Sequence, residues 1–315
     1  MNPGEKYLFN DRQMGVEFRY TVYADSKEQA EKAVTAANKR VHDLNQVFSD
    51  YIVESEVWQL SESSGKNKPV KVSPELWHIL KKSVEFNKKS NGAFDITAGP
   101  YFLLWRIARA KKSLPSARSM ARAANKVGVD MIIFDDKQQK VTLEAKSMRL
   151  DFGGIAKGYA ADEALKVLLS HGVKYALVDA SGDIAMTESP TGNWPITLAD
   201  DEKSSSNQMI ELDYGAVATS GDTLQFVEID GKRYSHIIDP QTGIGVTNRC
   251  RVTIVARDCM TADAMASTVT VLGPEKGLEL VEKMDGVEAY IQQVVNDGLK
   301  IFKSSGFPEL TIKKK

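Results

Sequence analysis

The chain has 315 residues, and its 41 basic and 42 acidic side chains give a formal net charge of −1. Hydrophobic residues make up 42% and charged residues 26%, which excludes a collagen-like, coiled-coil or disordered chain. The balanced charge argues against a dedicated nucleic-acid-binding protein, because such proteins carry a basic excess. No apolar run reaches the about 20 residues that span a bilayer. Residues 1–14 are polar and lack the apolar core of a signal peptide.

The cysteines and histidines limit the metal and redox chemistry that we expect. There are two cysteines, Cys250 and Cys259, and four scattered histidines. The two thiols could pair, but they are too few for a disulfide scaffold. The chain has no Cys-x-x-Cys pair, which argues against a zinc site of the cysteine and histidine type. We interpret the cysteines as two partly buried thiols.

The predicted elements mix strands and helices without strict alternation. Alternating apolar residues from Val16 to Val22 predict a strand over 15–24. Ser26 followed by Gln29 is a capping box, and the apolar positions after it predict a helix as far as Phe48. Further helices are predicted from Pro74, at 116–127, 156–171 and 260–272, and from Pro274. Further strands are predicted at 131–134, 141–143, 148–152, 175–178, 194–198, 210–212, 216–218, 226–229, 233–237, 251–255, 288–294 and 299–303.

This order of elements favours an α+β fold, with mixed or antiparallel sheets and packed helices, over a doubly wound parallel sheet. We expect residues 1–315 to form a single domain, either undivided or built as two lobes with the active site between them. The polar segment 200–208 is expected to be an exposed insertion, and residues 313–315 a frayed, solvated tail.

The first candidate site is Asp151-Phe-Gly-Gly-Ile-Ala-Lys-Gly158, which leads from a predicted strand into a predicted helix. Glycines allow a ligand to approach the backbone, free amides at a helix start attract phosphate, and Lys157 adds a positive charge. The structural alternative is a tight turn with a solvated lysine. The pattern differs from the Walker motif.

The second candidate is Ser235-His-Ile-Ile-Asp-Pro-Gln-Thr-Gly243. Turn formation explains its Asp, Pro and Gly residues. It does not explain His236 at the end of an otherwise aliphatic strand, beside a loop that carries Asp239. Most isolated histidines are structural, so the adjoining loop is what makes His236 a candidate.

The third candidate lies on the helix predicted at 260–272. Asp263 and Ser267 are four residues apart and therefore lie on one helix face. Two hard oxygen ligands on one face suit Mg²⁺, with water and phosphate completing the octahedron. The structural alternative is an aspartate favoured by the helix dipole and a serine in solvent.

Three weaker candidates remain. Asp95 lies in a segment framed by glycine and proline, and Tyr51 could stack on a ligand ring or simply be a half-exposed tyrosine. The run Ala218-Thr-Ser-Gly-Asp222 places two hydroxyls and a glycine at a strand end, which suits either a phosphate or a turn.

Each of these signals is weak alone, but their order along the chain resembles the FAD:protein FMN transferases, the ApbE-like family. The blocks are Met14-Gly15, Ser49-x-Tyr51, Phe94-Asp-Ile-Thr-x-Gly-Pro100, Gly153-Gly-Ile-Ala-Lys-Gly158, Gly182-Asp-Ile184, Thr219-Ser-Gly221, His236-x-Ile-Asp-Pro-x-Thr-Gly243 and Asp263-Ala264. The resemblance covers nearly the whole chain. It implies an α+β fold and a Mg²⁺-dependent enzyme that transfers FMN from FAD to a protein threonine and releases AMP.

The resemblance also implies roles for individual residues. His236 would be the proton acceptor beside the pyrophosphate, with Asp239 in the same catalytic loop. A carbonyl of the glycine turn, that of Gly154, would join Asp263 and Ser267 around Mg²⁺. The positions expected to bind FAD are Met14, Ser49, Tyr51, Asp95, Lys157, Asp183, Thr219, Ser220 and Ile238.

Some positions differ from the family pattern. Val16 stands where the family often has Thr, and Ala180-Ser181-Gly182-Asp183 stands where Gly-Gly-Asp is usual. Ser267 occupies the place of a metal-binding Thr; it keeps the hydroxyl but has a looser rotamer. We expect Thr268 to face another side of the helix and not to substitute for it.

The resemblance leaves alternatives open. The same site with water as nucleophile would hydrolyse FAD to FMN and AMP, and a drifted site would bind FAD without catalysis. The implied partner is an acceptor flavoprotein with a target threonine, such as a membrane electron-transport subunit, and no nucleic acid. Family members often work outside the cytoplasm, lipid-anchored or exported.

Overall fold

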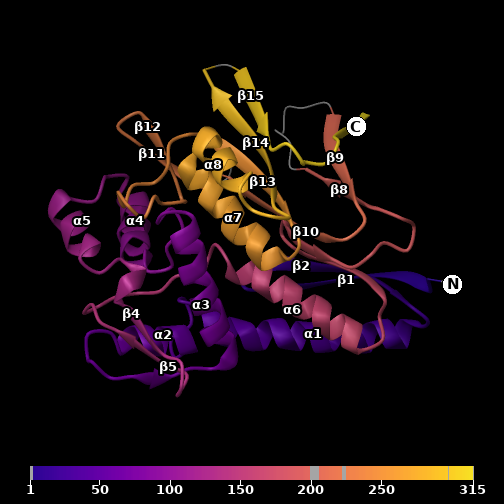
Figure 1. Ribbon diagram of the computed structural model, residues 1–315, viewed down its shortest axis with the longest axis horizontal. Helices are drawn as coiled ribbons and strands as arrows, with labels where there is room; N and C mark the ends of the chain where they lie inside the picture. The colour runs from indigo at the N-terminus through magenta and orange to yellow at the C-terminus, as the bar shows by residue number, and fades with distance from the viewer. Residues whose placement is uncertain (1–2, 199–205, 222–224, 297, 315) are drawn as a thin grey trace.

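The computed structural model describes residues 3–198, 206–221, 225–296 and 298–314 (Figure 1). The helices are α1 (Lys27–Phe48), α2 (Glu56–Glu62), α3 (Pro74–Lys89), α4 (Gly99–Lys111), α5 (Ala117–Ala124), α6 (Ala156–Ser170), α7 (Cys259–Leu272) and α8 (Pro274–Val281). The strands are β1 (Glu5–Gln13), β2 (Val16–Ala24), β3 (Val70–Lys71), β4 (Ile132–Asp135), β5 (Lys140–Leu143), β6 (Tyr175–Ala180), β7 (Asp183–Met186), β8 (Trp194–Thr197), β9 (Ser206–Leu212), β10 (Gly215–Gly221), β11 (Phe226–Ile229), β12 (Lys232–Ser235), β13 (Cys250–Ala256), β14 (Glu288–Val295), β15 (Gly298–Lys303) and β16 (Thr311–Lys314).

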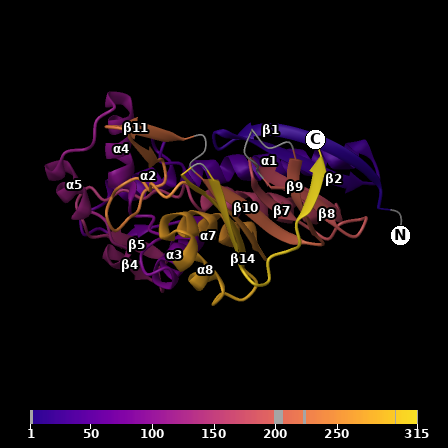
Figure 2. The same ribbon diagram turned by 90° about the horizontal axis from the view of Figure 1, so that it is seen from above.

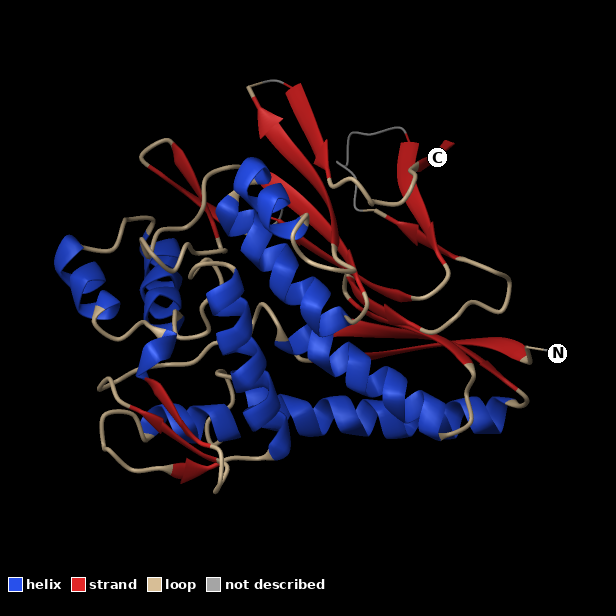
Figure 3. Ribbon diagram, viewed as in Figure 1, coloured by secondary structure: helices blue, strands red, loops and turns tan. Residues whose placement is uncertain are grey.

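The main sheet organises the fold. In the described part of the chain it has eight strands in the order β1-β2-β6-β7-β10-β13-β14-β15, and each neighbouring pair is antiparallel. Helices α1, α6 and α7 lie side by side across one face of this sheet (Figure 3). Strand β2 is separated from its neighbour β6 by about half of the chain, so their pairing joins the two halves of the sequence.

The two faces of the main sheet bury different side chains. On β10, Ala216 and Ala218 face the helices, whereas Val217 faces a second cluster on the opposite side. That cluster also includes Trp194 and Ile210, which come from the small sheet β16-β9-β8. The small residues on the helix side allow α7 to pack closely on β10.

Helices α4 and α5 and the hairpin β11-β12 form a separate hydrophobic cluster beside the main core. Trp105 is its centre: its indole is fully buried and lies 5.2 Å from the ring of Tyr234, centroid to centroid. The indole N–H donates to the carbonyl of Gly243 at 2.7 Å. This bond fixes the loop that follows β12 to α4. Seen from above, the cluster lies at the end of the molecule away from β8 and β9 (Figure 2).

The predicted α+β class and most predicted elements are confirmed. The capping box at the start of α1 forms, with the Ser26 hydroxyl accepting from the amide of Gln29. The predicted hairpins are β11-β12 and β14-β15, although Asp297 in the second turn lies outside the described residues. No helix within the described residues is long and apolar enough to cross a membrane.

Other elements differ from the prediction. Strands β1 and β7 and helices α2 and α4 were not predicted, and 148–152 is not a strand, since only Arg149 forms an isolated bridge there. Residues 313 and 314 belong to β16, which pairs with β9, so they do not form a frayed tail. Of the predicted insertion 200–208, residues 206–208 belong to β9 and the rest lie outside the described residues.

A substitution at Gly243 tests the attachment of this loop to α4. Gly243 has φ +70°, and a Cβ added there would lie 2.6 Å from the ring of Tyr101. We expect Gly243→Ala to lower the free energy of unfolding by roughly 2–4 kcal/mol. Gly231 has a similar φ of +72° but no atom near its Cβ position, so Gly231→Ala should cost only about 1 kcal/mol. Urea denaturation measures both, and equal losses would contradict the proposed contact.

Candidate active site

The glycine turn enters α6 and is packed against α7. Residues 153–155 form the turn, and α6 begins at Ala156, so the amide of Gly158 is one of the unpaired donors of the first helical turn. The Asp263 carboxylate of α7 accepts from this amide at 3.1 Å through Oδ2. A Cβ at Gly158 would overlap the carbonyl of Cys259. Glycine at this position therefore allows α6 and α7 to approach closely.

A carboxylate of α6 bonds in turn to the start of α7. The Asp162 carboxylate accepts from the amides of Cys259 and Met260, each at 2.9 Å. The local cap, Asp258, accepts from the amide of Thr261 at 2.8 Å. Burial raises the pKa of Asp162 to about 7, although the two amide bonds oppose this shift. The first turn of each helix is thus bonded to a carboxylate of the other.

Lys157 and two buried aspartates form the charged centre of the site. The Lys157 ammonium contacts the Asp183 carboxylate directly and lies 4.0 Å from Oδ2 of Asp263. Only 3% of Asp183 and 5% of Asp263 are exposed. Burial, together with repulsion from Asp263, raises the pKa of Asp183 to about 7, against the attraction of Lys157. Burial also raises the pKa of Asp263. Burial alone would lower the pKa of Lys157, but the two carboxylates raise it.

The glycine turn meets Ser267 across the helix pair. A Cβ added at Gly154 would lie 2.8 Å from the Ser267 hydroxyl, so these residues share a space that a larger side chain would fill. Within the part of the chain that the structure describes, the polar contacts of the Asp263 carboxylate are made by Oδ2 and not by Oδ1. Thr268 bonds back to the carbonyl of Ala264 at 2.7 Å inside the core, so it faces another side of α7, as the sequence predicts.

This donor set fits Mg²⁺. Two carboxylates and one ammonium leave a net negative charge in a desolvated place, and hydroxyl and carboxylate oxygens are the ligands that this ion prefers. Among the described residues, no group of three or more His, Cys, Asp or Glu side chains could hold a metal alone. Mg²⁺ commonly keeps waters and substrate phosphates as ligands, so a site with few protein ligands is compatible with it.

Thr219, Ser220 and Met14 lie at the same end of the main sheet as Asp183. Asp183 pairs with Ala218 in register, and the amide of Thr219 donates to the carbonyl of Gly182 at 3.2 Å. The Thr219 hydroxyl is within 2.9 Å of the hydroxyl of Thr253. Strand β2 pairs with β6, so the turn at Met14 lies at the same sheet end. Asp222 lies outside the described residues.

The C-terminal end of α1 holds Ser49 and Tyr51 next to the glycine turn. Phe48, the last residue of α1, packs on Phe152 with ring centroids 5.8 Å apart. The Ser49 hydroxyl accepts from the amide of Tyr51 at 3.3 Å. Tyr51 is 75% exposed, and the Arg106 guanidinium lies 4.2 Å from its ring centroid. This exposed ring, with a cation on it, is placed to contact a flat ligand.

Arg106 connects α4 to two aspartates near Tyr51. It bonds to Asp50 at 2.8 Å and lies 3.9 Å from Asp151. Burial and repulsion from Asp50 raise the pKa of Asp151 to about 6, while the amide of Gly153 and Arg106 oppose the shift. Asp151 opens the first candidate motif but was given no role of its own, and Arg106 was not singled out, because their proximity depends on α4, which the sequence did not predict.

Asp95 lies in the tight turn between α3 and α4, outside the charged centre of Lys157, Asp183 and Asp263. Its Oδ1 accepts from the amide of Thr97 at 2.7 Å and from its hydroxyl, and burial raises its pKa. The preceding Phe94 ring would lie 3.6 Å from a Cβ at Gly154. Asp95 therefore follows directly on a residue that lines the glycine turn.

The loop after β12 carries His236, Ile238 and Asp239. The Asp239 carboxylate is engaged in its own turn, accepting from the amide of Gln241 and the hydroxyl of Thr242 at 2.9 Å each. Ile238 is buried and forms a bridge with Gly245, so its side chain belongs to the hydrophobic cluster of α4. The side-chain amide of Gln241 donates through Nε2 to the backbone carbonyl of Asn91. This bond brings the loop next to the segment that carries Phe94.

The contacts of His236 assign its tautomer. Nδ1 lies 3.0 Å from the carbonyl oxygen of Gln225. A carbonyl only accepts, so Nδ1 carries the hydrogen, and in the neutral ring Nε2 is the nitrogen that can take up a proton. Ion pairs join Lys157 to Asp183 and Asp263, and Gly154 lies beside Ser267. The loop after β12 reaches this region through the bond of Gln241 to Asn91, close to Phe94, and reaches α7 through the bond of Asn248 to the carbonyl of Thr270.

The start of α6 lies together with a lysine, two buried carboxylates and a hydroxyl. This combination is typical of a site for a phosphate ester and a divalent cation. The model of the ApbE family matches residues 14–291. The chain belongs to the ApbE family.

Similar proteins cover nearly the same length. The FAD:protein FMN transferase of Haemophilus influenzae is 28% identical over 297 residues, which cover 89% of this chain and 86% of that protein. The flavin transferase ApbE from Vibrio cholerae has a TM-score of 0.85 at 28% identity, covering 97% of this chain and 99% of that one. The ApbE protein from Thermotoga maritima has a TM-score of 0.84 at 29% identity, covering 96% and 97% of the two chains.

Asp162 was also missed from the sequence, and its removal tests the bond between the two helices. We expect Asp162→Ala to lower the free energy of unfolding by about 2–4 kcal/mol, because two amides at the start of α7 lose their acceptor. Asp258→Ala, which removes the local cap of the same helix, should cost about 1 kcal/mol. Urea denaturation of both variants compares the two effects, and a smaller loss for Asp162→Ala would contradict the interpretation.

Proposed function

We propose that this chain transfers FMN from FAD to a threonine hydroxyl of an acceptor protein, with Mg²⁺ as its metal. The observation that carries the proposal is a cluster formed by Gly154 and Lys157 at the start of α6, by Asp263 and Ser267 of α7, and by Asp183 of β7. Its cation and the start of α6 suit a pyrophosphate, and its carboxylates and hydroxyl suit a divalent ion. Membership of a family whose named relatives are FAD:protein FMN transferases supports the same reaction.

The chemistry is a transfer between phosphate esters. The bond from the threonine oxygen to the phosphorus of the FMN half forms, the pyrophosphate linkage breaks, and AMP leaves. Such reactions need positioning and charge neutralisation more than covalent catalysis. Bound Mg²⁺ would be held by Asp263, Ser267 and the Gly154 carbonyl, and would neutralise charge on the phosphates. Lys157 supplies a fixed positive charge, which Asp183 orients.

The remaining residues bind, orient and move the proton. His236 takes the threonine proton on Nε2, since Gln225 holds the hydrogen on Nδ1. Asp239 acts as a positioning residue, because its carboxylate shapes the turn after His236. Tyr51 and Met14 contact the flavin or adenine rings, and Thr219 and Ser220 bond to the phosphates. Ser49, Asp95 and Ile238 shape the FAD pocket.

Asp263 tests the metal assignment. We expect Asp263→Asn to lower the transfer rate by at least about 100-fold and to weaken Mg²⁺ binding, because it removes the charge and keeps an acceptor for the amide of Gly158. Ser267→Ala should also lower the transfer rate and weaken Mg²⁺ binding. Ser267→Thr, which keeps the hydroxyl, should retain activity. Mg²⁺ titrations of AMP release measure these effects. Wild-type activity and Mg²⁺ dependence in Asp263→Asn would contradict the assignment.

His236 tests the proton acceptor and separates transfer from hydrolysis. The wild-type protein, FAD, Mg²⁺ and a threonine-bearing flavoprotein domain should yield a covalently fluorescent acceptor and AMP, and EDTA should abolish both. We expect His236→Ala to lose about 100- to 10,000-fold in rate while it still binds FAD. His171→Ala, which alters a histidine at the end of α6, is the matched control and should stay active. AMP and free FMN without a labelled acceptor would identify a hydrolase.

A further inference from the structure

The segment 96–129 is strongly basic, although the charges of the chain as a whole nearly cancel. It contains α4 and α5 and no acidic residue, although the whole chain has a net charge of −1. Its basic residues are Arg106, Arg109, Lys111, Lys112, Arg118, Arg122 and Lys126. We call this segment the basic lobe. A cluster of side chains with one sign of charge attracts partners of the opposite charge and holds them in a preferred orientation.

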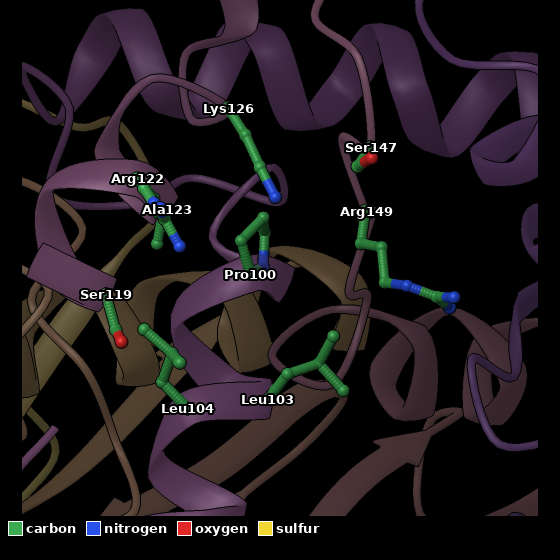
Figure 4. A pocket seen from close by; sticks show the side chains of 9 residues that line it. All are labelled: Pro100, Leu103, Leu104, Ser119, Arg122, Ala123, Lys126, Ser147 and Arg149. Atoms are coloured by element: carbon green, nitrogen blue, oxygen red, sulfur yellow. The ribbon is translucent and has the colours of Figure 1, made fainter.

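The basic lobe forms one side of a groove of 310 Å³ (Figure 4). Pro100, Leu103 and Leu104 of α4 give it an apolar floor. Arg122 and Lys126 reach across it toward that floor, as Figure 4 shows. Among the described residues, neither of these two cations forms an ion pair, and no acidic side chain lines the groove. An apolar floor below unpaired cations suits a segment that carries both apolar and acidic side chains.

The opposite side of the groove is formed by the segment that leads along the chain to the glycine turn. Arg149 lines the groove and forms a parallel bridge with Ala98, while two residues later the amide of Asp151 donates to the carbonyl of Ile96 at 2.8 Å. Gly154 is five residues beyond Arg149, so the chain between them spans at most about 17 Å. A bound peptide could therefore lie in the groove and place a hydroxyl in the site with a few residues of its own chain.

We propose that the groove binds an acidic segment of the acceptor protein, close in sequence to the residue that receives FMN; this rests on the proposed function. The groove is concave, and its cations lie over its floor, which fits a protein segment better than the flat surface of a membrane. The lobe thus selects the acceptor, while the cluster on α6 and α7 handles FAD. Specificity for acceptor and for FAD then resides in different residues.

The probe is a fluorescein-labelled peptide with one threonine next to a run of aspartate and glutamate, compared with the same peptide carrying asparagine and glutamine. Fluorescence anisotropy measures the binding of each peptide to the full chain. We expect the acidic peptide to bind more tightly, and Arg122→Glu/Lys126→Glu to weaken that binding by about tenfold or more. The milder Arg122→Gln/Lys126→Gln should act in the same direction, and thermal unfolding confirms that both fold.

The matched control is Lys111→Glu/Arg118→Glu, which changes the charge of the basic lobe equally at exposed positions that do not line the groove. It should weaken binding by less than about twofold. Equal losses in both pairs would show general attraction by charge and overturn the proposal. Equal binding of the two peptides by the wild-type protein would also overturn it. So would groove variants that lose binding to phosphatidylserine vesicles and keep binding to the acidic peptide.

Peptide binding requires neither FAD nor catalysis, so its outcome is independent of the proposed function. If the wild-type protein releases no AMP from FAD with an acceptor domain present, the proposed function fails while the groove can still be tested. If the wild-type protein does release AMP from FAD, Arg122→Glu/Lys126→Glu should raise the KM for the acceptor and leave the KM for FAD unchanged. An unchanged KM for the acceptor would overturn the assignment of the groove.

Discussion

The crossing of α6 and α7 holds the site together, because each helix supplies a carboxylate to the first turn of the other. Asp263 of α7 bonds to the amide of Gly158, and Asp162 of α6 bonds to the amides of Cys259 and Met260. Amides in the first turn of a helix lack partners within that helix, so both carboxylates satisfy donors that would otherwise be exposed to water or left unpaired. The absence of a side chain at Gly158 makes this approach possible. These bonds set the distance between the glycine turn of residues 153–155 and the face of α7 that carries Asp263.

This crossing also explains how opposite charges coexist in a small volume. The start of α6 and Lys157 attract anions, whereas Asp183 and Asp263 attract cations. Burial raises the pKa of both carboxyls, which shows that holding both charges there without a further cation costs free energy. A site of this kind is stabilised when a divalent ion and a phosphate enter together, since each neutralises the part of the site that the other leaves unbalanced.

The sequence predicts those parts of the molecule that depend on local patterns. The capping box of α1, the amphipathic helices and the hairpins all follow from nearby residues, and Asp263 and Ser267 share a face because of helical spacing alone. Helix α4 was missed because Gly99 and Pro100 suggest a loop and Ala98 gives no capping side chain, although proline is well suited to a first helical turn.

The apolar pattern at 148–152 suggests a strand. In the structure, however, its pairing with the segment that carries Ile96 and Ala98 consists of one bridge at Arg149 and one backbone hydrogen bond at Asp151. Asp162 shows the limit most clearly. Nothing in the spacing of α6 indicates that it faces the start of a helix about a hundred residues later, because that contact exists only after the sheet has placed α7 beside α6. The family resemblance indicates candidate positions for the site, but the geometry of these positions depends on tertiary contacts between segments far apart in the sequence.

The proposed proton acceptor and the proposed metal ligands are held by different hydrophobic clusters. The loop of His236 is fixed to the cluster of α4 through Trp105, whereas α6 and α7 belong to the main core. Contacts between the two include the bond of Gln241 to Asn91, the approach of Phe94 to the glycine turn, and the approach of Arg106 to Asp151. The position of His236 relative to the proposed metal ligands therefore depends on how these two clusters are joined. We expect a small change at Asn91 or Gln241 to shift the proposed base relative to the proposed metal ligands while both cores stay folded, which is how a positioning effect differs from a loss of stability.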